Sequence, residues 1–93
     1  MRVALVQTSL VWENPIANRL TLESKILSCS KKFDVLVLPE MFSSGFTMNP
    51  ERVAETMDGE TIQWLKSLAK TKKIAITGSL VIQEEGKFYN RLV

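Results

Sequence analysis

The feature that most constrains the fold is an uninterrupted apolar run, VLVL at residues 35–38, which is closed by Pro39 and followed by Glu40. β-Branched and aliphatic residues without polar alternation are typical of a strand covered on both faces of a sheet. Proline cannot donate a hydrogen bond to a neighbouring strand, so the strand ends there. Ligands of α/β proteins gather beyond the carboxyl ends of strands. Glu40 is therefore our candidate catalytic residue, although most acidic residues at strand ends are simply solvated.

The loop after Glu40 carries large apolar side chains that a purely solvated loop does not need. Residues 41–50 include Phe42, Phe46 and Met48. We expect Phe42 and Phe46 to bind substrate in a small pocket and to bury the Glu40 carboxylate in part. Packing in the core, or contact with a second subunit, explains apolar loop residues equally well.

Hydrophobic periodicity predicts an α/β fold with the order β-α-β-α-β-β. The predicted strands cover residues 2–8, 34–38, 74–82 and 87–93, and the predicted helices cover residues 16–31 and 60–70. Gly78 lies inside the third strand, where we expect a bulge or a close approach of the backbone. The fourth strand follows a turn at residues 84–86, so we expect it to pair back as a hairpin.

The two predicted helices carry recognisable end signals. Asn14 and Pro15 are typical of an N-cap followed by proline in the first turn. We expect the first helix to bury a stripe that contains Ile16, Leu20, Ile26 and Leu27. Lysines 70, 72 and 73 gather at the end of the second helix. There they compensate the negative end of the helix dipole, and we interpret them as solvated.

Composition excludes several classes of function. Twelve basic and ten acidic residues give a net charge of +2, so we expect no nucleic-acid and no membrane partner. The sequence has no histidine and a single cysteine, Cys29. A zinc or transition-metal site therefore has only carboxylates from which to be built, and no internal disulfide can form. Met1 is followed at once by a strand pattern without a signal peptide, so we expect a cytoplasmic protein.

The sequence stops at Val93 inside a predicted strand. A sheet that ended there would leave an unpaired edge and an uncovered apolar face, which is an aggregation hazard. We therefore expect residues 1–93 to form part of one domain that is truncated after its fourth predicted strand.

Several short segments together resemble the nitrilase superfamily of carbon-nitrogen hydrolases. They are residues 2–7 (RVALVQ), residues 34–40 (DVLVLPE) with Gly45-Phe46, Gly59, Gly78-Ser79, and residues 89–91 (YNR). These segments follow the family's order at similar spacing along the whole chain. Residues 39–48 (PEMFSSGFTM), with Trp12 and Trp64, are most similar to the omega-amidase branch.

This resemblance implies the amino-terminal part of an α-β-β-α sandwich and a Glu-Lys-Cys triad with Glu40 as the general base. In such a triad cysteine forms a thioester and lysine stabilises the oxyanion. The implied reaction hydrolyses the terminal amide of small dicarboxylic acid monoamides to acid and ammonia, without cofactor or metal. The family's lysine and cysteine would follow Val93, so we expect the 93-residue chain alone to be inactive. Similar proteins associate, which implies a homo-oligomer for the complete protein.

Two other functions remain open from the sequence. A nitrilase or an N-carbamoyl amino acid hydrolase of the same superfamily would share the fold and Glu40. Many family members carry tyrosine where Phe46 stands, so the choice of acyl group is not decided by the resemblance. A non-catalytic α/β module would instead leave Glu40 solvated and pair its open sheet edge with a partner.

Overall fold

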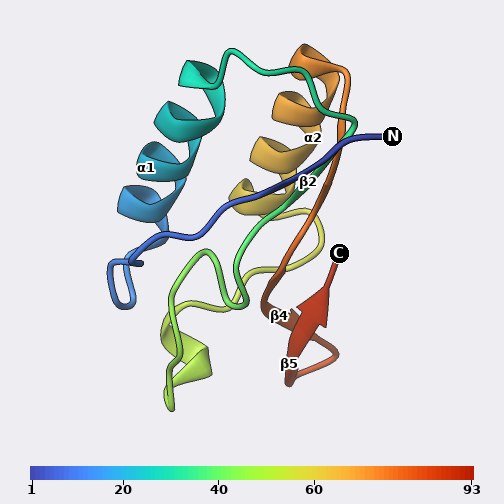
Figure 1. The fold of residues 1–93 in the computed structure, drawn as a ribbon. Helices are drawn as coiled ribbons and strands as arrows, with labels where there is room; N and C mark the ends of the chain where they lie inside the picture. Colours follow the sequence, from blue (N-terminus) through green and yellow to red (C-terminus); the bar gives the residue numbers. More distant parts are fainter.

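The computed structural model describes residues 1–93 and contains a parallel sheet with two helices on one face (Figure 1). Strands β1 (Val3–Leu5), β2 (Val35–Val37) and β3 (Ala75–Thr77) lie in the order β1-β2-β3. Both neighbouring pairs are parallel. Helices α1 (Pro15–Ser28) and α2 (Glu60–Lys72) connect these strands, and a short 3-10 helix, η1 (Pro50–Arg52), precedes α2. The α/β class predicted from the sequence is confirmed.

The expectation that the sheet is covered on both faces is wrong for these 93 residues. Leu36 in β2 is buried against the helices, whereas Val35 and Val37 are only half-buried. Val3 and Leu5 in β1 are exposed. Since successive side chains of a strand point to opposite faces, the helices cover one face and leave the other open.

The predicted third strand is in fact two strands that belong to different sheets. β3 ends at Thr77, and β4 (Ser79–Glu84) pairs antiparallel with β5 (Lys87–Leu92) in a separate hairpin. The observed order is therefore β-α-β-α-β-β-β, apart from η1. The predicted hairpin is confirmed: its two turn residues, Glu85 and Gly86, both have positive φ, which matches the right-handed twist of the strands.

Gly78 stands where the chain leaves the parallel sheet, and a side chain does not fit there. A Cβ atom on Gly78 would lie 2.9 Å from Leu38 Cβ and 2.9 Å from Phe42 Cδ1. The close approach predicted at this glycine is confirmed. It brings the start of β4 against the segment that follows β2.

The core lies between the two helices and the covered face of the sheet, and it extends to the hairpin. Its buried residues are Leu22, Ile26, Leu36, Leu38, Phe42, Ile62, Leu65, Leu68, Leu80 and Ile82. The ring of Phe42 lies 6.3 Å from that of Trp64 on α2. A smaller cluster of Met41, Val53 and Val81 packs on the other face of β4. No helix is long and apolar enough to cross a membrane.

The predicted apolar stripe of the first helix is largely wrong. The Asn14 side chain accepts a hydrogen bond from the Ala17 N–H, as expected of an N-cap. However, the buried positions are Asn18, Leu22 and Ile26, spaced four residues apart. Ile16, Leu20 and Leu27 are 63%, 64% and 53% exposed on the outer face. Polar Asn18 replaces an apolar residue on the inner face, so hydrophobic spacing alone selected the wrong side.

Asn18 holds two loops with its buried side-chain amide. Its Oδ1 accepts from the Val11 N–H at 2.7 Å, and its Nδ2 donates to the Val11 and Ser43 carbonyls, each at 2.8 Å. Val11 belongs to the loop after β1, and Ser43 belongs to the loop after β2. One side chain on α1 therefore fixes both loops at the carboxyl ends of neighbouring strands.

Glu55 supplies the N-terminal cap that α2 lacks at Gly59. Its carboxylate accepts hydrogen bonds from the Thr61 N–H at 2.7 Å and from the Thr61 hydroxyl. Arg19 on α1 lies 3.8 Å from the same carboxylate. The backbone of Glu55 also bonds to β4 through Val81 and Gln83. Glu55 thus ties both helices to the hairpin.

We expect Gly78→Ala to lower the free energy of unfolding of the chain by about 1–3 kcal/mol, because the added methyl group overpacks a closed contact. Urea denaturation followed by circular dichroism measures this loss. Lys70→Ala, on the exposed side of α2, serves as the control and should change the stability by less than about 0.5 kcal/mol. Equal stabilities of both variants would contradict the close approach at Gly78.

Asn18→Asp should destabilise the chain by about 3 kcal/mol, because it keeps the shape but replaces two donated hydrogen bonds with a buried charge facing carbonyl oxygens. The same denaturation experiment measures the effect. Asn49→Asp is the matched control, since the Asn49 side chain makes no capping hydrogen bond. Asn18→Asp unfolding at the same urea concentration as Asn49→Asp would show that the buried amide is dispensable.

Candidate active site

The backbone after β2 carries Glu40 to the edge of the sheet and then turns sharply. The Leu38 N–H still donates to the Thr77 carbonyl of β3 at 2.8 Å, so the pairing continues up to Pro39. Met41 adopts a left-handed backbone conformation with φ of 53°. This conformation is uncommon for a residue other than glycine, asparagine or aspartate and persists only where surrounding contacts fix it.

The hairpin supplies those contacts. The Met41 N–H donates to Ser79 Oγ at 2.9 Å, and the Phe42 N–H donates to the Ser79 carbonyl at 3.0 Å. Asn90 on β5 donates from Nδ2 to Glu40 Oε1 at 3.1 Å. The first residues of β4 and the middle of β5 therefore hold the turn that presents Glu40.

The outer part of the loop is tied to the segment after β1. The Thr47 hydroxyl donates to Glu13 Oε2 at 2.6 Å, and Arg52 lies 3.5 Å from the other oxygen of Glu13. Trp12 Nε1 donates to the Phe46 carbonyl at 2.9 Å. These bonds fix the loop backbone while leaving the Phe46 side chain free.

A cavity of about 250 Å³ opens beside Glu40. It is lined by Glu40, Met41, Phe46, Thr47, Pro50, Val81, Phe88, Tyr89 and Asn90. Apolar walls with a few convergent polar groups are typical of small-molecule sites. The cavity offers one carboxylate as a proton acceptor, but no cysteine or lysine lines it, so it holds a base without a nucleophile.

The structure separates the two phenylalanines predicted to bind substrate. Phe46 lines the cavity and is 75% exposed. Phe42 is fully buried in the core beside Gly78, and it does not reach the cavity. Phe42 is therefore a core residue, because the turn at Met41 directs it inward.

Glu40 is less enclosed than the sequence suggested. The expected partial burial among Phe42, Phe46 and Met41 is not found, since the Glu40 residue is exposed in these 93 residues. Of those three neighbours, only Met41 and Phe46 share its cavity. Glu40 nevertheless stands at the wall of a cavity, and its only protein hydrogen bond comes from Asn90.

Sequence reasoning missed Asn90, Ser79 and Asn18. Asn90 belongs to the YNR segment that contributed to the family resemblance, but the sequence alone assigns its side chain no place in the site. The register of the hairpin, which pairs Asn90 with Val81, is what brings it to Glu40. No short-range pattern links residues 40 and 90.

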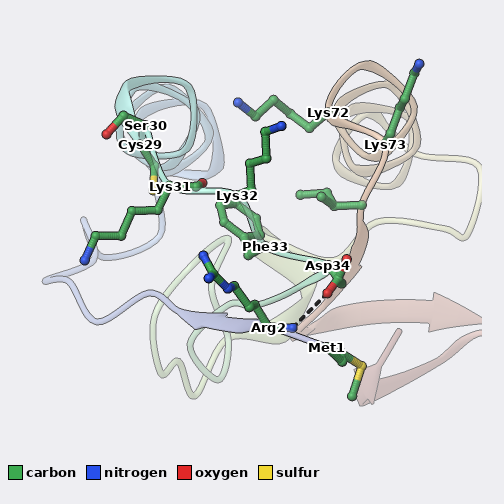
Figure 2. A pocket seen from close by; sticks show the side chains of 11 residues that line it. Met1, Arg2, Cys29, Ser30, Lys31, Lys32, Phe33, Asp34, Lys72 and Lys73 are labelled. Atoms are coloured by element: carbon green, nitrogen blue, oxygen red, sulfur yellow. Dashed lines mark hydrogen bonds between the residues drawn. The ribbon is translucent and has the colours of Figure 1, made fainter.

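A second cavity of about 730 Å³ lies at the opposite, amino-terminal edge of the parallel sheet (Figure 2). It is lined chiefly by basic side chains: Arg2, Lys31, Lys32, Lys72 and Lys73. Lys32 and Lys72 point into the space between the two helix ends, whereas Lys31 and Lys73 point away. Lys31 and Lys32 follow α1, and Lys72 and Lys73 lie at the end of α2. Positive charge at these places complements the helix dipoles.

Asp34 and Cys29 belong to this second cavity. The Asp34 carboxylate accepts a hydrogen bond from the Arg2 N–H at 2.7 Å (Figure 2). This bond links the residue before β1 to the residue before β2. Cys29 is exposed at the end of α1. Since Glu40 follows the carboxyl end of β2 and Cys29 lies near the amino ends of the strands, the two residues are not part of one site.

The sequence of this chain is similar to those of several amidases. Omega-amidase YafV of Escherichia coli strain K12 is 31% identical over 93 residues, which are 100% of this chain and 36% of that protein. The 2-oxoglutaramate amidase of Bacillus subtilis is 32% identical, covering 97% of this chain and 36% of the relative. An (R)-stereoselective amidase from a Pseudomonas species is 33% identical over 70 residues, 73% of this chain and 26% of that protein. The chain thus spans about a third of the length of its amidase relatives.

A solved structure has the same fold. The crystal structure of XC1258 from Xanthomonas campestris, described as a CN-hydrolase superfamily protein with an arsenic adduct in the active site, superimposes with a TM-score of 0.92. The two proteins share 37% identity, over 99% of this chain and 35% of that one. Residues 2–93 also match the sequence pattern that describes the carbon-nitrogen hydrolase family. Because the family match covers residues 2–93 and the relatives and the solved structure agree with it, the chain belongs to the carbon-nitrogen hydrolase family.

Proposed function

We propose that this chain forms the amino-terminal part of an amidase of the omega-amidase type, with Glu40 as its general base. The observation that carries the proposal is the position of Glu40 at the carboxyl end of β2, on the wall of a small, largely apolar cavity. The names of the relatives supply the substrate class, the terminal amide of a small dicarboxylic acid monoamide.

In the proposed reaction, Glu40 first takes the proton of a cysteine thiol supplied by sequence beyond Val93. The thiolate attacks the amide carbon, and a lysine from the same later sequence stabilises the tetrahedral oxyanion. The C–N bond then breaks, Glu40 returns the proton to the leaving nitrogen, and ammonia departs. Glu40 next takes a proton from water, whose oxygen attacks the thioester and releases the acid. The cysteine leaves as a thiolate, and Glu40 returns the proton to it, which restores both groups. The cycle needs only water and the amide.

The open face of the parallel sheet supports the proposed architecture. Val3 and Leu5 are exposed, and Val35 and Val37 are half-buried, so this face presents a continuous apolar surface. We propose that a second sheet covers this face in an α-β-β-α sandwich, since an uncovered sheet of this kind is costly in water. Glu40 would then lie beside the second layer and be less exposed than in the 93-residue chain.

The apolar walls of the cavity bear on substrate size. Met41, Phe46, Val81 and Phe88 line it beside Glu40, and Thr47, Tyr89 and Asn90 supply the uncharged polar groups. A cavity of about 250 Å³ suits a small acyl group. This supports a short amide over a large one. A nitrilase or an N-carbamoyl amino acid hydrolase with the same base remains the second candidate function.

The 93-residue chain by itself should release no ammonia from 2-oxoglutaramate, because it holds the base without the cysteine and lysine. The complete polypeptide should release ammonia continuously from the same substrate. A coupled glutamate dehydrogenase assay measures both. Sustained turnover by the 93-residue chain would refute the division of the triad, and a complete polypeptide that prefers nitriles or N-carbamoyl amino acids would favour the second candidate.

Glu40→Gln in the complete polypeptide should lower kcat/KM by about 100-fold or more, since a positioned general base contributes at least that much. The substitution keeps the shape of the side chain and removes the proton acceptor. Glu51→Gln is the control, because Glu51 is exposed in η1 and does not line the cavity. An activity of Glu40→Gln within about threefold of the parent would contradict the role of Glu40 as a base.

A further inference from the structure

We propose that Asn90 is the positioning residue that orients the general base, an inference that rests on the proposed function of Glu40. Asn90 Nδ2 donates to Glu40 Oε1 at 3.1 Å, and no other protein group donates a hydrogen bond to this carboxylate. With Oε1 held, Oε2 is the oxygen free to exchange a proton with the nucleophile. Asn90 itself does not touch the reacting atoms.

One face of the hairpin, the face that carries Asn90, holds the turn at Glu40 and Met41. Ser79, Val81 and Asn90 share it, since Val81 pairs directly with Asn90 and Ser79 lies two residues before Val81. Ser79 binds the Met41 N–H, Val81 packs on the Met41 side chain, and Asn90 binds the Glu40 carboxylate. These three contacts all come from one face of the hairpin, and together they fix Glu40 and Met41.

The opposite face of the hairpin carries the cation Arg91 and keeps it away from Glu40. Arg91 points there, donates to Glu84 Oε2 at 3.0 Å and lies 5.4 Å from the centre of the Tyr89 ring. The hydrogen bond from Arg91 lowers the pKa of Glu84, so Glu84 stays ionised and retains the guanidinium. A one-residue slip of β5 would exchange the faces and bring Arg91 to Glu40.

A neutral amide suits a base better than a guanidinium does. A cation beside a carboxylate favours its charged form and weakens it as a proton acceptor. The amide of Asn90 supplies one directional hydrogen bond without a full charge. It can therefore fix the orientation of Glu40 without placing a full positive charge beside the carboxylate, as a guanidinium would.

The test compares Asn90→Ala and Asn90→Asp with the parent, in the complete polypeptide and with 2-oxoglutaramate. We expect Asn90→Ala to lower kcat by about 10-fold to 100-fold with KM changed by less than about twofold, because misorientation of a catalytic group affects the chemical step. Asn90→Asp, which keeps the size but places a second carboxylate beside Glu40, should lose at least as much. Lys87→Gln, an exposed position on the other face of the same hairpin, should retain the parental kcat.

A double variant distinguishes positioning from general damage to the hairpin. If Asn90 acts through Glu40, adding Asn90→Ala to Glu40→Gln should lower the residual activity by less than about twofold, since coupled residues are not additive. The proposal would be overturned if Asn90→Ala lowered the activity of Glu40→Gln by as large a factor as it lowers that of the parent. A kcat of Asn90→Ala within about twofold of the parent would overturn it as well.

The contact can also be tested without turnover, which separates it from failure of the proposed reaction. In the complete polypeptide labelled with ¹⁵N-asparagine, the side-chain amide protons of Asn90 should shift when Glu40 is replaced by Gln, because a bond to a charged acceptor is lost. Lys87→Gln should leave these signals in place. Unchanged Asn90 signals in Glu40→Gln would overturn the positioning role even if the enzyme proved to be an amidase.

Discussion

The close contact between Gly78 and the segment after β2 determines where Glu40 can lie. At this point the chain leaves the parallel sheet and starts the hairpin, and a Cβ atom would stand 2.9 Å from both Leu38 and Phe42. Because the backbones approach so closely, Ser79 can bind the N–H groups of Met41 and Phe42. The left-handed turn at Met41 then directs Phe42 into the core and leaves Glu40 at the surface of the cavity. A larger residue at position 78 would disturb the core and the candidate site together.

Two asparagines make hydrogen bonds that hold this region, and their environments differ. Asn18 is buried and satisfies backbone groups of two loops, where an unpaired amide would be costly. Asn90 is exposed and meets only the Glu40 carboxylate. The first sets the backbone around the site, and the second sets the orientation of one side chain. The amino-terminal edge of the sheet has a different character, since lysines at the ends of α1 and α2 gather there around a basic cavity.

Much of the fold was predictable because it depends on local signals. The apolar run before Pro39, the cap at Asn14, and the turn at Glu85-Gly86 identified a strand, a helix start and a hairpin that the structure contains. The errors have physical causes. The inner face of α1 was misplaced because Asn18 is polar yet buried, and one predicted strand became β3 and β4 because sequence periodicity does not reveal a change of sheet. Phe42 was assigned to the pocket because composition does not indicate which way a loop side chain turns.

The sequence by itself determined that the chain has an α/β fold and that Glu40 follows a strand, because the apolar run and the proline that ends it are consecutive residues. It also carried the segments that resemble carbon-nitrogen hydrolases. Only the tertiary structure decided what surrounds Glu40: that Phe46 lines its cavity while Phe42 does not, and that Asn90, fifty residues later, binds its carboxylate. Those relations arise from the close approach at Gly78 and from the register of the hairpin. Both are long-range contacts that no local pattern of residues specifies.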